Sequence, residues 1–249
     1  LSEAESWGKK PSTGSYKVET KSDEGSLTTG GSLVKAEPED GYGVVTAKLA
    51  EMIEEQIVSG EFETIEAPTE MLEAEDASER EVYLIASATT SFKGSDKNRR
   101  YNIWKISDKL NGVVFKPGET FSVNTHVGER NAANGWKEGQ GIEDGMLTPQ
   151  YGGGICQVST TMYNATLKAE MKMVNRLPHT MHVKYVPEGL DATISTGGPD
   201  FKVMNRLESE MYMIVRCDNP SSTVTVEVYG YQERDYDIKR STEKISTSE

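Results

Sequence analysis

Three consecutive glycines followed closely by a cysteine constrain this chain more than any other feature. They lie in the sequence YGGGICQVSTTMYNA at residues 151–165. Glycine adopts positive φ angles and lets other groups approach the backbone closely. After the glycines, apolar residues recur at helical spacing, and neither Pro nor Gly occurs from Ile155 to Lys172. The sequence therefore predicts a tight turn that leads into a helix, with Cys156 in its first turn.

A cysteine in that position is suited to nucleophilic chemistry. The first turn of a helix has unpaired N–H groups and the positive end of the helix dipole, and both favour a thiolate. The backbone N–H groups of Gly153, Gly154 and Cys156 would also face an oxyanion. The alternative is an inert, buried cysteine at a tight turn, which is the commoner case. The glycines and the hydroxyl run from Ser159 to Thr161 favour the chemical interpretation.

A cysteine nucleophile needs a base, and the chain has three histidines. His179 follows Pro178 and precedes an expected strand at residues 181–186. A strand that runs back along the helix would return this histidine to Cys156. We therefore take His179 as the base.

The other polar candidates have weaker claims. His182 would face the opposite side of the expected strand from His179, and His126 reads as a structural residue. Asp191 follows a turn and would orient the histidine as the third member of a triad. Asn205 is the alternative for that role. Both are equally suited to simple turns.

Several other chemistries are disfavoured. A phosphate-binding loop would need Lys and Ser or Thr after the glycines, and they are absent. No CxxC or HExxH spacing supports zinc, so we expect neither a metal nor another cofactor. The two cysteines, Cys156 and Cys217, are expected to be free thiols, because a disulfide would remove the nucleophile.

Composition limits the partners. The formal net charge of −13 disfavours nucleic acid and anionic membranes. No apolar run approaches the roughly 20 residues of a membrane span. The chain begins with Leu1 rather than Met, so we expect a processed product. A removed N-terminal anchor would be its one route to a membrane.

The apolar pattern predicts an α+β protein with two domains and a tail. A small N-terminal α+β module is expected over residues 10–77, and a mainly antiparallel β domain that bears the cysteine helix over residues 82–232. Residues 233–249 read as a polar tail, and the acidic stretch 70–81 reads as a linker. Strands are expected at residues 15–20, 32–36, 62–67, 82–88, 120–123, 181–186, 192–195, 201–204, 211–217 and 223–229, helices at 43–60 and 101–110, and an irregular segment at 128–150.

The glycine–cysteine motif resembles the signature of the VanW family, and flanking segments agree with it. Those segments are NG at 111–112, KPGETFS at 116–122, VGER at 127–130, HT at 179–180, YVPEGLDAT at 185–193 and DFKVMN at 200–205. The resemblance covers residues 82–230. More faintly, residues 15–67 resemble the small peptidoglycan-binding domain that often precedes VanW domains.

The resemblance implies roles for particular residues. Members are surface proteins of mainly Gram-positive bacteria, and some act as L,D-transpeptidases with the motif cysteine as nucleophile. In this chain that cysteine is Cys156, and His179 matches the family's histidine, whereas His182 falls where the family varies. With Asp191 as the third catalytic candidate, the implied oxyanion and substrate-binding residues are Gly153, Gly154, Ser159, Thr160, Arg130 and Tyr185.

The implied function is that of an extracellular, cell-wall-associated L,D-transpeptidase. It would crosslink the stem peptides of peptidoglycan through a thioester acyl-enzyme, without a cofactor and without nucleic acid as a partner. One alternative is a non-catalytic surface protein that binds or scaffolds peptidoglycan. Another is a cysteine-dependent peptidoglycan peptidase. The resemblance implies nothing about oligomeric state.

Overall fold

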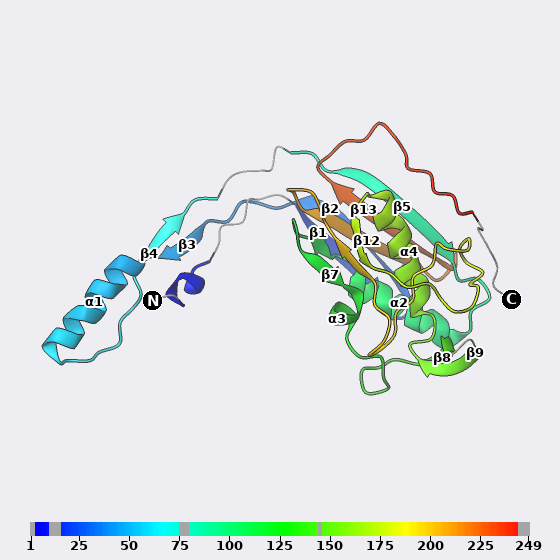
Figure 1. Cartoon of the computed structure of the whole chain (residues 1–249), viewed down its shortest axis with the longest axis horizontal. Helices are drawn as coiled ribbons and strands as arrows, with labels where there is room; N and C mark the ends of the chain where they lie inside the picture. Colours follow the sequence, from blue (N-terminus) through cyan, green and yellow to red (C-terminus); the bar gives the residue numbers. More distant parts are fainter. Residues whose placement is uncertain (1–2, 10–15, 75–79, 144–145, 244–249) are drawn as a thin grey trace. The chain divides into compact units, whose positions relative to one another are not determined.

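The computed structural model describes residues 3–9, 16–74, 80–143 and 146–243, and these belong to two compact units. The smaller unit comprises residues 1–17 and 33–81, and the larger unit comprises residues 18–32 and 82–249. Figure 1 traces the chain through both. Helices and mainly antiparallel strands make up the fold, which confirms the predicted α+β class.

The smaller unit contains a two-stranded antiparallel sheet, a short 3-10 helix that packs against it, and one α-helix. In the sheet, Gly41 pairs with Leu72. The helix ends where Gly60 takes a left-handed conformation and its N–H bonds to the Gln56 carbonyl, as a glycine C-cap does. The elements are the short helix η1 (Ala4–Trp7), β3 (Gly41–Val44), α1 (Thr46–Ser59) and β4 (Thr69–Leu72).

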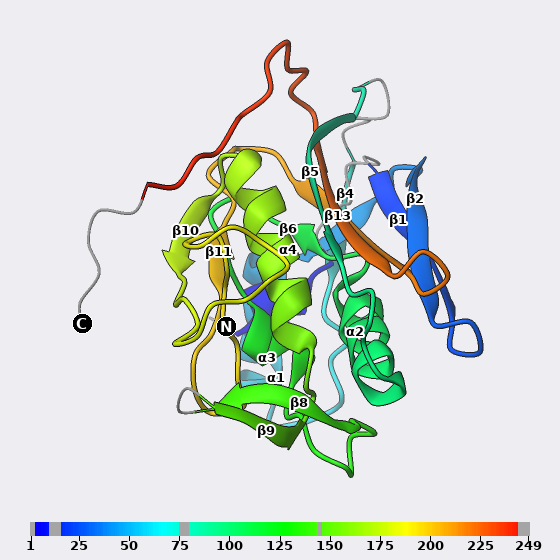
Figure 2. The same cartoon turned by 90° about the vertical axis from the view of Figure 1, so that its right-hand side faces the viewer.

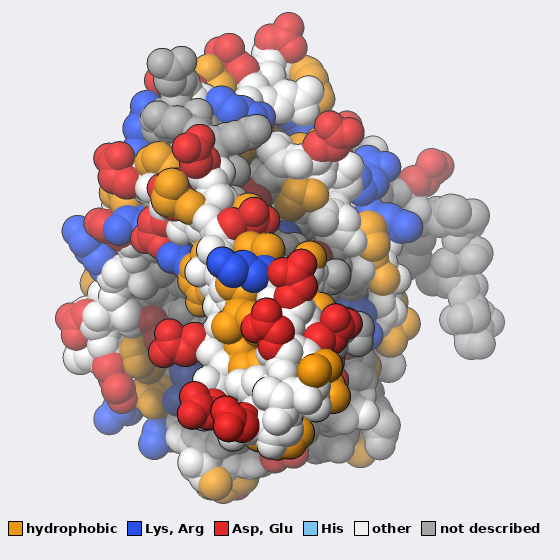
Figure 3. Space-filling model, turned by 90° about the vertical axis from the view of Figure 1, so that its left-hand side faces the viewer, with side chains coloured by type: hydrophobic (Ala, Val, Ile, Leu, Met, Phe, Trp, Pro, Cys, Tyr) orange, Lys and Arg blue, Asp and Glu red, His pale blue; other side chains and the backbone are white. Residues whose placement is uncertain are grey.

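This smaller unit differs from the sequence prediction in two places. Residues 62–67 form no strand, and Phe62 is 76% exposed. The predicted acidic linker at 70–81 begins inside β4, because its first residues pair with β3, and residues 75–79 lie outside the described ones. The unit leaves large apolar side chains such as Ile57 exposed. Figure 3 shows acidic and hydrophobic side chains interspersed on the surface toward the viewer.

The larger unit is built on a six-stranded sheet with the order β1-β2-β12-β13-β5, and β6 also pairs with β12. The two central strands pair along their whole length, from Tyr212 opposite Tyr229 to Asp218 opposite Thr223. Most residues of β12 are buried. The strands are β1 (Tyr16–Asp23), β2 (Thr28–Lys35), β5 (Tyr83–Ser91), β6 (Val114–Phe115), β12 (Met211–Asp218) and β13 (Thr223–Gly230).

The first two strands do not follow the predicted domain boundary. Sequence analysis assigns them to an N-terminal module over 10–77, but β2 pairs with β12 through Thr29 opposite Cys217. The indole N–H of Trp104 also donates to the Thr28 carbonyl at 3.2 Å. Pairing with these strands covers an edge of β12 that would otherwise lack backbone partners. Residues 18–32 therefore belong to the larger unit.

Two long helices lie on one face of this sheet (Figure 2). The helix α2 (Lys97–Leu110) packs against β12, and α4 (Ile155–Lys168) packs against β5, β13 and α2. The first begins at Asp96, whose carboxylate accepts the N–H of Arg99 as a helix N-cap. The core between helices and sheet includes Ile103, Ile106, Leu110, Val158, Met162, Val215, Val226 and Val228.

The rest of the larger unit departs most from prediction. The segment 128–150, predicted to be irregular, contains an antiparallel hairpin in its described part, whereas the strands predicted at 181–186 and 192–195 are irregular chain. The cysteine helix stops at Lys168, before Glu170 adopts a positive φ angle. The remaining elements are α3 (Val123–Val127), β7 (Thr120–Ser122), β8 (Glu138–Glu143), β9 (Met146–Tyr151), β10 (Lys172–Asn175) and β11 (Lys202–Met204).

Candidate active site

The glycine turn places a cysteine in the first turn of α4, as predicted. Gly152 and Gly154 have φ angles of 82° and 106°, a backbone conformation that other residues rarely adopt. Between them, Gly153 lies so close to β8 that an added Cβ would be 2.4 Å from the carbonyl of Gly139. Each glycine is thus required for conformation or for close packing, and together they fix the position of Cys156.

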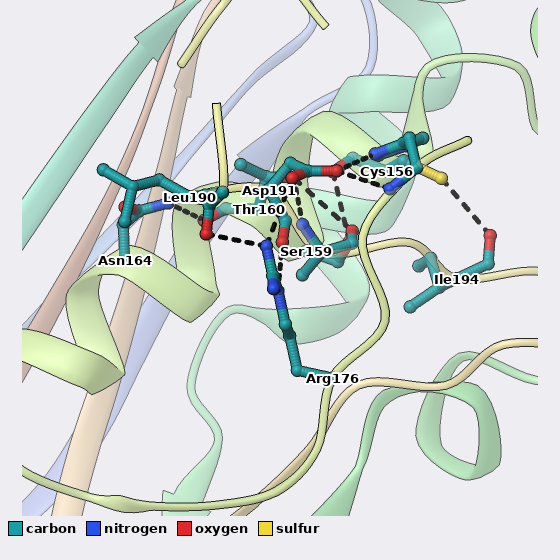
Figure 4. Close-up of polar contacts among 11 residues, drawn as sticks. Cys156, Ser159, Thr160, Asn164, Arg176, Leu190, Asp191 and Ile194 are labelled. Atoms are coloured by element: carbon teal, nitrogen blue, oxygen red, sulfur yellow. Dashed lines mark hydrogen bonds and ion pairs between the residues drawn. The ribbon is translucent and has the colours of Figure 1, made fainter. Parts of the chain in front are cut away.

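The two cysteines are both free thiols, which confirms the prediction. Cys156 is partly exposed, and its Sγ donates to the carbonyl of Ile194 at 3.3 Å (Figure 4). Cys217 is only 2% exposed within β12, and burial raises its pKa to about 12. Cys156 is therefore the thiol that reagents and substrates reach.

His179 is held by Asp191. The Nδ1 atom of His179 lies 2.5 Å from the Oδ2 atom of Asp191, and the backbone N–H of His179 donates to the same oxygen at 2.6 Å. Both side chains are buried. One carboxylate oxygen thus fixes the position of the histidine and the tautomer of its ring, as in a catalytic triad.

His179 also interacts with Cys156. Burial lowers the pKa of His179, but hydrogen bonds with Asp191 and Cys156 outweigh it and raise this pKa to about 9. Burial likewise raises the pKa of Asp191, but the hydrogen bonds from His179 hold it below its usual value. At neutral pH the arrangement is an imidazolium between a carboxylate and a sulfur.

Arg176 completes this row, and the sequence analysis did not single it out. Its Nε donates to the Asp191 carbonyl at 2.6 Å, and one terminal nitrogen lies 3.2 Å from the Asp191 carboxylate (Figure 4). The same nitrogen donates to the Gly189 carbonyl at 2.8 Å. Arg176 therefore orients Asp191 from the side opposite the histidine.

Two predicted substrate-binding residues, Ser159 and Thr160, instead organise the protein itself. Both are fully buried. The hydroxyl of Ser159 donates to the Ala192 carbonyl at 2.6 Å, and the hydroxyl of Thr160 accepts the Ala192 N–H at 2.9 Å. One turn later, Asn164 donates to the Leu190 carbonyl at 2.7 Å. Side chains of α4 thus attach the segment that carries Asp191 to the helix.

The predicted oxyanion donors are not equivalent. The N–H of Gly153 donates to the Gln150 carbonyl at 3.2 Å, so it is occupied. Within the described backbone, the N–H groups of Gly154 and Cys156 donate to no carbonyl. These two are the donors that remain beside the sulfur.

Cationic and phenolic side chains also lie around Cys156. The Tyr185 hydroxyl interacts with Thr160, and burial raises the Tyr185 pKa. Arg130, a predicted substrate-binding residue, lies beside the motif, with its Cβ and Cγ 3.2 Å from where a Gly152 Cβ would be. Arg99, which the sequence analysis did not single out, donates to Gln157 Oε1 at 2.7 Å.

The remaining predicted candidates lie elsewhere. His126 Nε2 contacts the Lys109 carbonyl at 2.8 Å. His182 is an exposed side chain 3.6 Å from Glu188. Asn205, the alternative third member, is fully buried and bonded to other backbone groups. A hollow of about 210 Å³ beside His179 and Asp191 has as its walls residues 178–183 with Glu188, Gly189 and Asp191.

The family comparison agrees with the resemblance. A profile of the VanW family, described as VanW like protein, matches residues 98–229. That range is more than half of the 249 residues and contains Cys156, His179 and Asp191. The chain therefore belongs to the VanW family.

Two curated relatives are similar to about half of this chain. The uncharacterized protein YoaR of Bacillus subtilis (strain 168) is 39% identical over 141 residues, 57% of this chain and 46% of the relative. The vancomycin B-type resistance protein VanW of Enterococcus faecalis (strain ATCC 700802 / V583) is 34% identical over 130 residues, 49% of this chain and 46% of the relative. The chain thus spans about half the length of these relatives. No solved structure matches it significantly.

Among the described residues, no helix is both long enough and apolar enough to cross a bilayer.

Proposed function

We propose that this chain is a cysteine-dependent acyltransferase of the bacterial cell wall, acting on peptidoglycan stem peptides as an L,D-transpeptidase. The observation that carries the proposal is the row Cys156–His179–Asp191, in which a partly exposed thiol contacts an imidazolium held by a carboxylate. Nucleophile, base and orienting group are the parts that covalent acyl transfer needs. The vancomycin resistance for which one relative is named supports a cell-wall substrate.

In the first half-reaction, the proton of the Cys156 thiol lies on His179, and the Sγ thiolate attacks the carbonyl carbon of an L-residue in the donor peptide to form a C–S bond. The carbonyl oxygen gains negative charge and accepts hydrogen bonds from the backbone N–H groups of Gly154 and Cys156. Collapse of this intermediate breaks the C–N bond to the terminal D-amino acid. His179 gives its proton to the leaving nitrogen, and a thioester remains.

In the second half-reaction, an amine of an acceptor peptide attacks the thioester carbonyl. Neutral His179 takes the proton of that amine while the new C–N bond forms and the C–S bond breaks. The thiolate and the imidazolium are regenerated together. The hollow beside His179 leaves room for the acceptor next to the base.

Two other functions use the same residues differently. If water replaces the acceptor amine, the protein is a peptidoglycan peptidase. If Cys156 does not react, it is a binding or scaffolding protein. In each case we expect an extracellular protein that meets peptidoglycan at the cell surface.

The test is incubation of the protein with a disaccharide-tetrapeptide, followed by mass spectrometry. Crosslinked dimers and released D-amino acid support the transpeptidase, and tripeptide without dimers indicates the peptidase. Cys156→Ala serves as the control, because it removes the sulfur and opens little space. Dimers formed equally by that variant would contradict the proposal.

A further inference from the structure

Two arginines lie beside Cys156 without carboxylate partners. In the described part of the chain, neither Arg99 nor Arg130 forms an ion pair, although the protein carries a formal net charge of −13. Arg130 is only 7% exposed. Charged side chains this buried are normally paired. In the described chain, only longer-range charges such as those of Asp96, Asp200 and the Cys156 sulfur act on the two guanidinium groups, so a further anion would find two cations without an ion-pair contact at one site.

Arg99 is fixed and reaches the glycine turn. Its terminal nitrogens donate to Ser95 Oγ at 2.5 Å and to Gln157 Oε1 at 2.7 Å. A Cβ on Gly154 would lie 2.7 Å from Arg99 Cγ and 3.4 Å from Nε. The side chain thus crosses the backbone two residues before the cysteine, and it is partly exposed there.

Whereas Arg99 lies next to Gly154, Arg130 lies next to Gly152, at the start of the glycine turn. Its terminal nitrogens donate to the Gly128 carbonyl at 2.9 Å and to Asn124 Oδ1 at 2.8 Å, but its buried Nε has no partner. Its Cβ and Cγ lie 3.2 Å from where a Gly152 side chain would begin. A buried donor without an acceptor is costly, so the charge of Arg130 is incompletely compensated by the described protein groups around it.

We propose that Arg99, supported by the buried charge of Arg130, forms a carboxylate-binding site that holds the free C-terminal carboxylate of the acyl-donor peptide. This deepens the proposed function and rests on it. In a donor that ends in a D-residue, only an amide nitrogen and an α-carbon separate this carboxylate from the scissile carbonyl. A cation beside the nucleophile therefore selects peptides with a free terminus, because a peptide extended or amidated there offers no charge.

The structure also supplies a matched control. Arg100 follows Arg99 on the same helix, but its guanidinium donates to Asn219 Oδ1 at 2.8 Å and to Ser222 Oγ at 3.0 Å, on the β12–β13 turn. Removing either arginine changes the net charge equally. Only Arg99 lies beside the cysteine.

The test compares two alkylating reagents of similar size, anionic iodoacetate and neutral iodoacetamide, by their rates at the Cys156 peptide in mass spectra. Both react with the same thiolate, so any change in thiol ionisation cancels in the ratio of rates. We expect Arg99→Gln to lower the iodoacetate-to-iodoacetamide ratio by roughly tenfold or more, the usual worth of a hydrogen bond to a charged group. Arg100→Gln should leave it unchanged. An unchanged ratio in Arg99→Gln, or an equal fall in both variants, would overturn the site.

A second measurement uses the wild-type protein and so does not depend on the folding of a variant. N-acetyl-D-alanine should protect Cys156 from iodoacetamide, and N-acetyl-D-alaninamide should not. Equal protection by the two compounds, or none by either, would contradict the proposal. Neither measurement needs turnover, so the site stands or falls separately from transpeptidation. If crosslinks form while both tests fail, only the carboxylate site is lost.

Discussion

At the scale of single residues, His179 is the side chain whose removal should matter most after Cys156. A positioned acid–base group contributes about 10²–10⁴-fold to rate, so His179→Ala should slow acylation of Cys156 by that factor. The matched control is His182→Ala, because His182 is 53% exposed and contacts only Glu188 among the described ion pairs. Single-turnover mass spectrometry measures both rates. Equal rates in the two variants would remove His179 from the mechanism.

The pKa of His179 also predicts a pH dependence. This pKa rises from 6.5 to about 9 on folding, so the folded protein keeps its proton at pH values where the unfolded chain has lost it. The histidine therefore stabilises the fold fully below pH 6.5, and this contribution is lost as pH rises through about 9. The Tm advantage of wild type over His179→Gln should shrink across that interval. An advantage that grows toward alkaline pH would show that the charge is not stabilising.

The same titration should appear in turnover. In the proposed mechanism, the imidazolium protonates the leaving nitrogen, so kcat/KM for the donor peptide should fall as pH rises through about 9. A rate that is still rising well above that value would show that the leaving group takes its proton from elsewhere.

Sequence predicted the row of Cys156, His179 and Asp191 but not the contacts that support it. The structure places Cys156 in the first turn of α4 with His179 beside it, and their catalytic roles stay predictions. The hydrogen bonds of Ser159 and Thr160 could not be predicted from local patterns, because their partner Ala192 lies about thirty positions away in the sequence. Arg99 gave only a weak signal, because it is one of two adjacent arginines that lie outside the motif and the flanking segments that agree with the family.

At the scale of elements, the close approach of the glycine turn to β8 can be tested directly. Gly153→Ala would place a Cβ 2.4 Å from the Gly139 backbone, so the hairpin or the turn must shift. Overpacking of this kind costs about 1–3 kcal/mol of unfolding free energy. The control is Gly25→Ala, whose Cβ would meet only the flexible Asp23 carboxylate at 3.2 Å. Denaturant unfolding measures both, and equal stabilities would mean that the turn accommodates a side chain.

The predicted elements failed where polar contacts replaced regular structure. The strand expected at 192–195 is irregular where side chains of α4 bond to the backbone carbonyls of Leu190 and Ala192, which a neighbouring strand would otherwise bond. The strand expected at 181–186 is irregular as well. The hairpin β8–β9 was missed because Gly139 and Gly141 lower its apparent strand propensity. Helix α4 was predicted well because its apolar spacing and its glycine turn agree.

At the scale of the whole molecule, the strand β2 makes the two predicted domains inseparable by a single cut. Residues 18–32 belong to the larger unit, although they precede the smaller unit's helix in sequence. Local patterns could not reveal this, because the partner of Thr29 is Cys217, far along the chain. The sequence identified the strands and assigned them to the wrong neighbour.

This arrangement predicts the behaviour of a cut chain. A site-specific protease sequence inserted between Glu73 and Glu81 should allow complete cleavage, and the two fragments should then co-elute in gel filtration under native conditions. They should separate only in denaturant, because β2 stays paired with β12. The control is a variant whose insertion has the same length but lacks the protease sequence, so that it is not cleaved. Fragments that separate without denaturant would mean that the first two strands belong to an independent module.

The most direct test of the central claim is the mass of Cys156 after exposure to a donor peptide. The protein is mixed with disaccharide-tetrapeptide without an acceptor, quenched in acid and digested. We predict that the Cys156 peptide gains the mass of the donor minus its terminal D-amino acid, and that hydroxylamine, which cleaves thioesters, removes this addition. Cys156→Ala should gain nothing. Donor turnover by the wild-type protein without an adduct at Cys156, or turnover that persists in Cys156→Ala, would contradict the account.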